Sequence, residues 1–257
     1  MSRTCLVTGA ASGIGEATTA LLRARGHTVI AADLTDGDIR ADLSTPEGRA
    51  ALVARTRELT GGRLDAVVSC AGVARFDPLT IRVNHFGAVA TLDGLRPLSR
   101  PAPTRGPWSS APSTPSTRRT PRSWTPRSPG TRRRRWPPPG RPSTVARAPR
   151  LLLVEGVGLP LGPPRRPHRR VGGAGVPLNA VAPGVVVTPL TRPMLDDPEM
   201  RGLVDKSVPM PLHGHARPEQ IAPLIAWLAS PENTVVTGQV VFADGGADAV
   251  LRGDRTW

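Results

Sequence analysis

Short apolar runs alternate with segments of helical spacing along the first hundred residues and the last eighty or so. The apolar runs predict buried strands at Thr4–Thr8, His27–Ala32, Leu64–Cys70, Val176–Ala182 and Val235–Ala243. The helical spacing predicts helices at Glu16–Arg25, Pro46–Leu59, Ile81–Leu95 and Pro218–Leu228. Continuous apolar strands that alternate with helices are typical of βαβ units. We therefore predict an α/β fold with a doubly wound parallel sheet.

The block from residue 101 to residue 172 lacks this pattern. It contains 16 Arg, 17 Pro, no Lys and one acidic residue, Glu155, whereas the rest of the chain carries 18 basic and 19 acidic side chains. Prolines at this density exclude helices and central strands, and Leu151–Val154 is the only apolar island. We expect one domain over 1–257, with an aberrant, Pro/Arg-rich segment at 101–173 that is irregular or disordered and adds nothing to the core.

The charge distribution bears on the kind of partner. A net charge of +14 ordinarily indicates nucleic acid or an anionic membrane, but the whole excess lies in the middle block. Arg132–Arg135 beside Trp136 offer phosphate contacts and a stacking ring, yet the many prolines and the absence of Lys disfavour a nucleic-acid partner. The sequence has neither a signal-peptide pattern nor a membrane-length apolar run. We expect a cytoplasmic protein without a membrane partner, in which Cys5 and Cys70 are free thiols.

A glycine-rich turn joins the first predicted strand to the first helix. Thr8–Gly15 has the spacing G-x-x-x-G-x-G, and glycine is needed where backbone turns tightly or approaches a diphosphate. The helix start offers free N–H groups to the anion. This context predicts a Rossmann-like dinucleotide site at Gly9, Ser12, Gly13, Ile14 and Gly15, and no metal site is indicated.

Asp33 ends the second predicted strand, 18 residues after Gly15. A carboxylate at this point accepts hydrogen bonds from the adenosine ribose and repels a 2′-phosphate. The pattern therefore predicts NAD as the cofactor and disfavours NADP. The alternative interpretation is a solvated aspartate in a turn.

At these residues the chain resembles the short-chain dehydrogenase/reductase family, and more narrowly its bacterial 3α-hydroxysteroid dehydrogenases and carbonyl reductases. The resemblance covers Met1 to about Arg100 and about Ala174 to the end. Its marks are Thr8–Gly15, Ala41–Ser44, Cys70–Gly72, Val83–Gly87, Asn179–Gly184 with Thr188, and Asp244–Gly246 followed by Ala249-Val250.

The resemblance implies roles for further residues. Asp42 and Leu43 would flank the adenine, Ala71-Gly72 the cofactor ribose and Thr188 the nicotinamide carboxamide, and Pro183-Gly184 would also belong to the cofactor site. Asp42 has a second interpretation, a simple helix-flanking acid. Cys70 stands where the family usually has asparagine, which should loosen hydrogen bonding there. The implied function is interconversion of a secondary alcohol, such as a hydroxysteroid, and a ketone by a protein that is usually a homo-oligomer.

Most of the family's catalytic groups have no counterpart in this chain. Members use a Ser that polarises the substrate oxygen, a Tyr that exchanges its proton, a Lys that lowers the Tyr pKa, and an Asn. The chain has no Tyr, and its one lysine, Lys206, lies outside any Y-x-x-x-K pattern. Asn84 alone has a counterpart, and a structural helix Asn is the alternative interpretation. A catalytically dead dinucleotide-binding protein therefore remains a second hypothesis.

The genetic code offers a reason for these absences. One shifted reading frame joins the last two bases of each codon to the first base of the next. In this frame Leu151-Leu152 permits Tyr, and Glu155-Gly156 permits only Lys or Arg. The pairs between them permit Ser. In the other frame, the pairs from Trp108-Ser109 onward permit an apolar strand and a Ser, about 40 codons before the Tyr, close to the family's spacing. Normal order resumes near Gly173. We hypothesise an out-of-frame translation of residues 101–173, with a genuine Arg/Pro-rich insertion as the alternative.

The segment Pro189–His215 is predicted to be a loop that covers the substrate. Its apolar side chains suit a greasy molecule, and ordinary loop packing is the other interpretation. These side chains are Leu190, Met194, Leu195, Met200, Leu203 and Met210.

Overall fold

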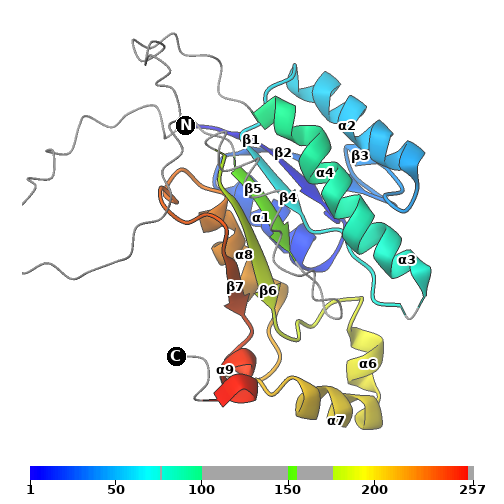
Figure 1. The fold of residues 1–257 in the computed structure, drawn as a ribbon, viewed down its shortest axis with the longest axis vertical. Helices are drawn as coiled ribbons and strands as arrows, with labels where there is room; N and C mark the ends of the chain where they lie inside the picture. Colours follow the sequence, from blue (N-terminus) through cyan, green and yellow to red (C-terminus); the bar gives the residue numbers. More distant parts are fainter. Residues whose placement is uncertain (76, 100–149, 155–175, 254–257) are drawn as a thin grey trace, which may run out of the picture.

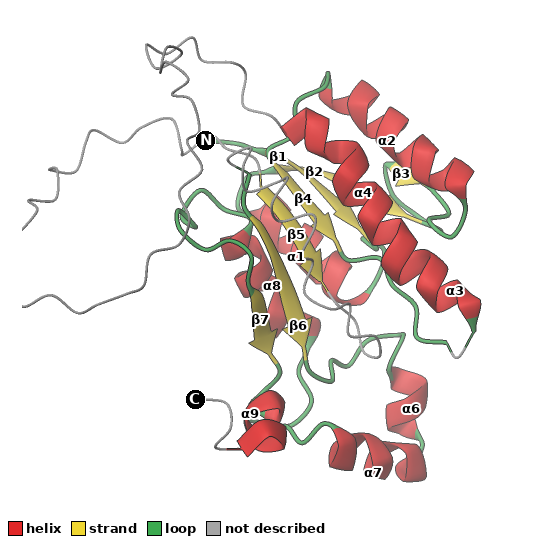
Figure 2. Cartoon of the chain, viewed as in Figure 1, coloured by secondary structure: helices red, strands yellow, loops and turns green. Residues whose placement is uncertain are grey.

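The computed structural model describes residues 1–75, 77–99, 150–154 and 176–253. Seven parallel strands form one sheet in the order β3-β2-β1-β4-β5-β6-β7 (Figures 1 and 2). Strands from both sides of the Pro/Arg-rich block therefore share one sheet. The strands are β1 (Thr4–Thr8), β2 (Thr28–Asp33), β3 (Ile39–Arg40), β4 (Ala66–Ser69), β5 (Arg150–Val154), β6 (Leu178–Pro183) and β7 (Val240–Ala243).

Helices cover both faces of this sheet, which confirms the predicted doubly wound architecture (Figure 2). α1 and α8 lie together on one face, and α2 and α4 lie together on the other. The helical segments are α1 (Gly13–Ala24), α2 (Pro46–Thr60), α3 (Pro78–Thr80), the π-helix η1 (Ile81–Gly87), α4 (Ala88–Leu95), the 3₁₀ segment η2 (Arg96–Ser99), α6 (Arg192–Asp196), α7 (Pro198–Ser207), α8 (Pro218–Leu228) and α9 (Ala247–Arg252).

Alternate residues of the central strands supply two apolar cores. Cys5 and Val7 of β1 face the core that includes Leu22 of α1 and Ile225 of α8. Leu6, between them, faces the other core together with Leu52 of α2 and Leu95 of α4. Because both faces are buried, the strands have continuous apolar sequences, and this is why their positions were predictable.

Several predicted elements differ from the observed ones at their boundaries. The predicted strand Val235–Ala243 is wrong over its first five residues, because the chain turns at Gly238 with φ of 77° and pairs only from Val240. The predicted helix Ile81–Leu95 begins as the π-helix η1, which contains Asn84, and continues as α4. Such turns are rare and occur mostly at functional sites.

The prediction that residues 101–173 are irregular is wrong at Arg150–Val154. This segment forms β5 and pairs in parallel with β4 on one side and β6 on the other. Its four consecutive apolar residues suit a strand at the centre of a parallel sheet. A composition averaged over the whole block concealed this short apolar run. The other residues of 101–173 lie outside the described ranges.

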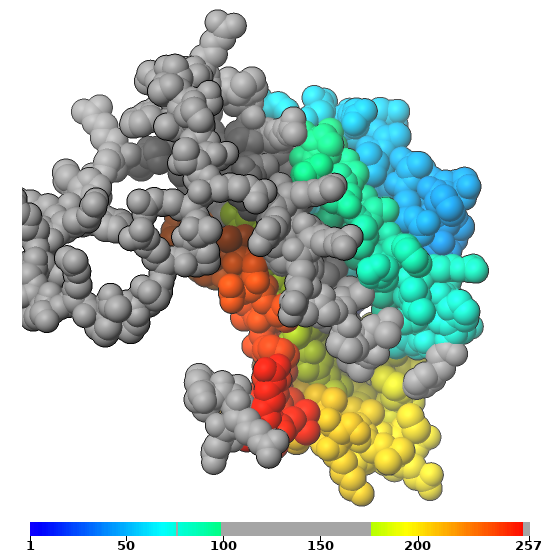
Figure 3. Space-filling model, in the orientation of Figure 1, coloured from blue at the N-terminus to red at the C-terminus, as the bar shows by residue number. Residues whose placement is uncertain are grey.

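The segment predicted to be a loop, 189–215, contains two helices. Pro193 and Pro198 lie in the first turns of α6 and α7, where proline is tolerated, and the Asp197 side chain caps α7 through the amides of Glu199 and Met200. In the space-filling view α6 and α7 (yellow) are at the surface, lower in the picture than α3 and η1 (cyan) (Figure 3). Within the described residues, no helix is long and apolar enough to cross a membrane.

Candidate cofactor-binding site

A pocket of about 420 Å³ gathers most of the residues predicted for the cofactor. Those in its wall are Gly9, Ser12, Gly13, Ile14, Gly15, Asp33, Asp42, Leu43, Ala71, Gly72, Asn84 and Thr188. Pro183 and Gly184 are not in this wall, and Gly184 packs against Asp244 and Met210, so their assignment to the cofactor site stays a prediction. The volume is that of an ordinary small-molecule site.

The glycine turn is packed so closely that side chains are excluded from it. Gly9 has φ of 68°, and a Cβ there would lie 2.8 Å from Cα of Ala71. A Cβ on Gly15 would overlap the carbonyl oxygen of Gly9. Ser12 is the N-cap of α1, and its side chain makes no capping hydrogen bond. The first turn of α1 therefore presents backbone N–H groups at the pocket, as an anionic diphosphate requires.

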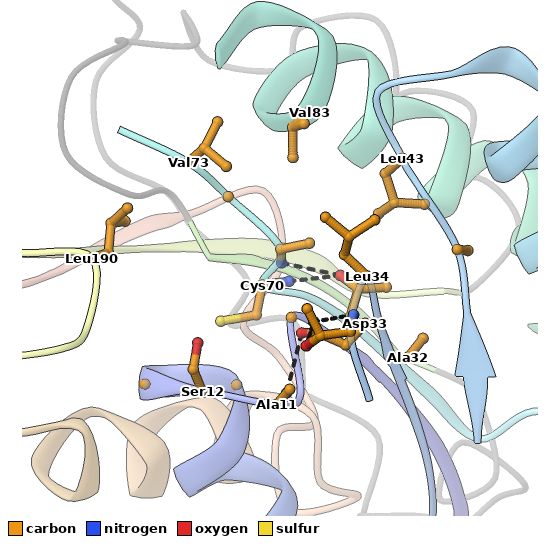
Figure 4. A pocket seen from close by; sticks show the side chains of 18 of the residues that line it. Ala11, Ser12, Ala32, Asp33, Leu34, Leu43, Cys70, Val73, Val83 and Leu190 are labelled. Carbon is orange, nitrogen blue, oxygen red and sulfur yellow. Dashed lines mark hydrogen bonds between the residues drawn. The ribbon is translucent and has the colours of Figure 1, made fainter. Parts of the chain in front are cut away.

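The carboxylate of Asp33 lies against this turn (Figure 4). Its Oδ2 accepts a hydrogen bond from the backbone N–H of Ala11 at 3.1 Å, and its Oδ1 accepts from the amide and hydroxyl of Thr35 at 3.2 and 3.1 Å. A carboxylate has about four acceptor positions, so Oδ2 retains capacity for a further donor. The end of β2 thus brings a negative group to the wall beside the glycine turn.

Asp42 and Leu43 lie in the same wall but differ in environment. The amide of Ser44 donates to Oδ1 of Asp42 at 2.8 Å. Hydrogen bonds from the Ser44 hydroxyl and amide hold the pKa of Asp42 below its ordinary value. Leu43 is buried and contacts the position of Gly87 at the end of η1. The pair offers one apolar surface and one exposed carboxylate to the pocket.

The junction of β1 and β4 forms the floor of the pocket. The Thr8 hydroxyl accepts hydrogen bonds from the amides of Cys70 and Ala71, both at 3.1 Å. Figure 4 shows these two bonds as dashed lines next to the Cys70 label. The Thr8 hydroxyl therefore fixes the backbone at Cys70, the position where the family usually has asparagine. Sequence reasoning missed Thr8, although its place at the end of the strand before the glycine turn was a usable signal.

Thiol labelling is expected to be slow at both cysteines. Burial raises the pKa of Cys5 from 9.0 to about 11 and that of Cys70 to about 12. Cys70 as a whole residue is only partly buried, but its thiol is not exposed. At pH 8 the Cys70 thiolate is about a thousandfold scarcer than that of an ordinary thiol, so Ellman's reagent should react with the native chain about that much more slowly than with free cysteine. Labelling of the native chain at the free-cysteine rate would contradict this.

The same two shifts set the direction of an alkaline stability change. The folded chain holds both thiol protons more tightly than the unfolded chain, so this stabilisation is complete below about pH 9. It is lost as the pH rises through about 11 to 12. Cys70→Ala should flatten part of that loss when urea unfolding is measured along a pH series.

Comparison with known proteins identifies the family. A family model described as enoyl-(acyl carrier protein) reductase matches residues 168–248. The 3-alpha-hydroxysteroid dehydrogenase/carbonyl reductase of Comamonas testosteroni is 31% identical over 96% of this chain and 97% of its own length. The chain belongs to the short-chain dehydrogenase/reductase family. It is thus a member of a family of oxidoreductases with a Rossmann-like fold.

Solved structures of this family agree with the fold. The 3-alpha-hydroxysteroid dehydrogenase of Pseudomonas sp. B-0831, complexed with NADH, is 29% identical, with a TM-score of 0.72 and 98% and 99% of the two chains covered. A Beutenbergia cavernae protein described as an NAD(P)-dependent gluconate 5-dehydrogenase, with bound NADP, has a TM-score of 0.65 at 24% identity, and 96% and 97% are covered. Structures with both nicotinamide cofactors are therefore among its relatives.

Asn84 is the one predicted catalytic residue in the pocket wall, and its side chain is engaged with the backbone of Val73. Its Oδ1 accepts from the Val73 amide and its Nδ2 donates to the Val73 carbonyl, both at 2.9 Å. The amide thereby ties η1 to the segment that follows β4. This arrangement supports a structural role for the side chain, and its catalytic role stays a prediction.

Thr188 lies against the glycine turn at Gly13, whereas Asp33 contacts the turn at Ala11. A Cβ on Gly13 would lie 3.0 Å from the Thr188 methyl group, so the two residues are in close contact. Leu190, which sequence reasoning assigned only to the substrate loop, also lines the pocket. The pocket contains no Tyr or Lys side chain among the described residues, and Lys206 lies on α7 outside its wall.

Proposed function

We propose that this chain binds NAD in preference to NADP and that its gene encodes an oxidoreductase that interconverts a secondary alcohol and a ketone. The observation that carries the cofactor proposal is the Asp33 carboxylate on the glycine turn, 3.1 Å from the Ala11 amide. Gly9, Gly13 and Gly15 would hold the diphosphate at the start of α1, and Asp33 the adenosine ribose. The bound cofactor would supply or accept the hydride.

Charge and hydrogen bonding at Asp33 both favour the NAD form. A ribose 2′-hydroxyl can donate to the free acceptor position on Oδ2, whereas a 2′-phosphate has no such proton at neutral pH and is negatively charged. The pocket-lining residues near Asp33 are Ala32, Leu34 and Thr35, none of which is basic. Arg40 pairs with Asp33 across β2 and β3 but does not line the pocket, so no basic residue of this part of the wall would compensate a phosphate.

Asp33→Asn tests the cofactor preference. We expect NADH affinity to fall about tenfold, because a charge-assisted hydrogen bond is lost, and the NADH-over-NADPH preference to fall by about a hundredfold, because repulsion of the 2′-phosphate is lost as well. Dissociation constants measured by quenching of protein fluorescence report both values.

Asp36→Asn is the matched control for this variant. It makes the same charge change three residues away, at an exposed side chain that does not line the pocket. The preference should stay within about twofold of the parent value, since exposed charges are screened by salt. An equal loss of preference in the two variants would point to general electrostatics instead of a ribose contact at Asp33.

The substrate proposal rests on the apolar character of the segment beside the pocket. Leu190 reaches the pocket wall, and Met200 and Leu203 on α7 are exposed. Such side chains suit a greasy alcohol, and the relatives named for hydroxysteroid dehydrogenase activity point to the same class. We propose a hydroxysteroid or a similar apolar secondary alcohol.

The reading-frame hypothesis is part of this proposal. The codons of Leu151-Leu152 and Glu155-Gly156 permit Tyr and Lys four residues apart, the Y-x-x-x-K spacing of the family. The codons from Trp108 onward permit the strand with the Ser. In the restored protein we propose that this earlier strand takes the place between β4 and β6 that Arg150–Val154 occupies here. Sequencing the gene across codons 101–173 tests the hypothesis.

The second candidate is a binding protein without catalysis. The absence of Tyr from the whole chain and the double engagement of Asn84 with Val73 favour it for the present sequence. The two candidates share the NAD site and differ in turnover. NADH binding without hydride transfer by a protein whose gene sequence is verified would select the second.

A further inference from the structure

We propose that Met210 is a positioning residue for Thr188 and so acts on the nicotinamide half of the dinucleotide site. This inference rests on the proposed NAD binding. Met210 does not line the pocket. Its side chain contacts two turns, at the carboxyl ends of β6 and β7.

The Met210 side chain fills the hollow between these two turns. Its Sδ accepts a hydrogen bond from the backbone N–H of Val185 at 3.2 Å. A Cβ on Gly184 would lie 2.9 Å from the same Sδ, and one on Gly245 would lie 3.0 Å from the Met210 Cε. Glycine at both places therefore makes room for the thioether. A flexible, polarisable side chain suits such an irregular gap.

The segment around Met210 is itself fixed by backbone hydrogen bonds. The Leu212 amide donates to the Gly245 carbonyl at 3.0 Å, and the Gly214 amide donates to the Met210 carbonyl at 3.2 Å. Met210 therefore sits on a braced turn that also contacts the end of β7. Because its backbone is fixed in this way, the Met210 side chain can fix the position of the Val185 backbone.

From Val185 a short series of hydrogen bonds leads to Thr188. The amide of Ala216 donates to the Val185 carbonyl at 2.9 Å, and the Val187 amide donates to the Ala216 carbonyl at 2.8 Å. The Thr191 hydroxyl donates to the Val186 carbonyl at 2.5 Å and accepts from the Thr188 amide at 2.9 Å. Each residue from 185 to 188 is thus fixed by at least one hydrogen bond, and Met210 supplies the acceptor for the Val185 amide.

The far end of this series lies against the glycine turn. The Thr188 methyl group contacts the position of Gly13, whereas Asp33 contacts the same turn through Ala11. Figure 4 shows Leu190 and Asp33 at opposite sides of the pocket, with Ala11 and Ser12 between them. A dinucleotide with its adenosine at Asp33 and its diphosphate at the turn places its other half toward Thr188 and Leu190.

This arrangement predicts an effect confined to one half of the ligand. Loss of the Met210 side chain would leave the Val185 amide without its sulfur acceptor and open a cavity beside Gly184, so that the 185–188 segment shifts. The contacts of Asp33 and of the first turn of α1 do not involve Met210. The nicotinamide end should therefore lose affinity while the adenosine diphosphate end keeps it.

Isothermal titration of the full chain with NADH and with ADP-ribose tests the proposal. ADP-ribose carries the adenosine and diphosphate but lacks nicotinamide. We expect Met210→Ala to weaken NADH binding about tenfold and to leave ADP-ribose binding within about twofold of the parent. Met210→Leu, which refills the volume without the acceptor, should weaken NADH binding by a smaller factor, about threefold, and leave ADP-ribose binding unchanged. Leu59→Ala, an exposed residue of α2, is the control and should change neither affinity.

The outcomes separate this inference from the proposed function. A parent chain that binds neither ligand would overturn the dinucleotide site and the role of Met210 with it. Equal weakening of both ligands by Met210→Ala, or no change in either, would overturn the positioning role and leave the site in place. If Met210→Ala does not fold, Met210→Leu decides, since a smaller loss that is still confined to NADH supports the proposal and an unchanged ratio contradicts it.

Discussion

Hydride transfer is expected to be undetectable with the present sequence and to appear when the reading frame across codons 101–173 is restored. The present chain has no Tyr to exchange the substrate proton, and general acid–base catalysis alone is worth a factor of roughly 10² to 10⁴. Loss of the Ser and the Lys would lower the rate further. Initial rates with NAD and a hydroxysteroid, followed by NADH fluorescence, measure the difference.

The control for this comparison is a restored gene in which the regained Tyr codon is changed to Phe. That protein keeps the strand, the helix and the Lys, so it separates loss of the acid from loss of the fold. It should bind NADH like the restored protein and turn over as poorly as the present chain. Appreciable turnover by the present chain would show that the chemistry resides in residues other than those of the family pattern.

Gly15→Ala is expected to abolish NADH binding and to lower the stability of the chain. Its Cβ would overlap the Gly9 carbonyl oxygen, and Gly9 is itself packed against Ala71, so the turn has no room to yield. Overpacking at a rigid site costs about 1 to 3 kcal/mol, and displacement of the turn removes the N–H groups that hold the diphosphate. NADH titration and urea unfolding, on the same protein, should both reveal the change, with an affinity loss of about a hundredfold or more.

Gly202→Ala makes the same chemical change where there is space. A Cβ on Gly202 meets no atom within 4 Å, and the residue lies inside α7. We expect an unchanged NADH affinity and a stability gain of about 0.5 to 1 kcal/mol, because alanine is the better helix former. If Gly15→Ala behaved like Gly202→Ala, close packing at the glycine turn would not govern the site.

Local signals made much of the site predictable from the amino-acid order. The turn Thr8–Gly15 combines a strand, three spaced glycines and a helix start within a few residues, so its geometry follows from backbone sterics. Asp33 was predicted from its place at the end of the second strand, 18 residues after Gly15, and its carboxylate lies beside the glycine turn. The missing Tyr is also a property of the sequence alone.

Other features depended on partners distant in the chain. Arg150–Val154 forms β5 between β4 and β6, at the centre of a parallel sheet, where apolar sequences are usual. The proline-rich sequence on either side of this segment gave no sign of a strand there. The packing of Gly184 against Met210, 26 positions away, could not be read from its motif. The sequence by itself determined the glycine turn that we propose binds the dinucleotide, because the geometry of this turn is set by residues close together in the chain. Only the tertiary structure decided which side chains reach the pocket and which support it, because those contacts join residues that the chain order keeps apart.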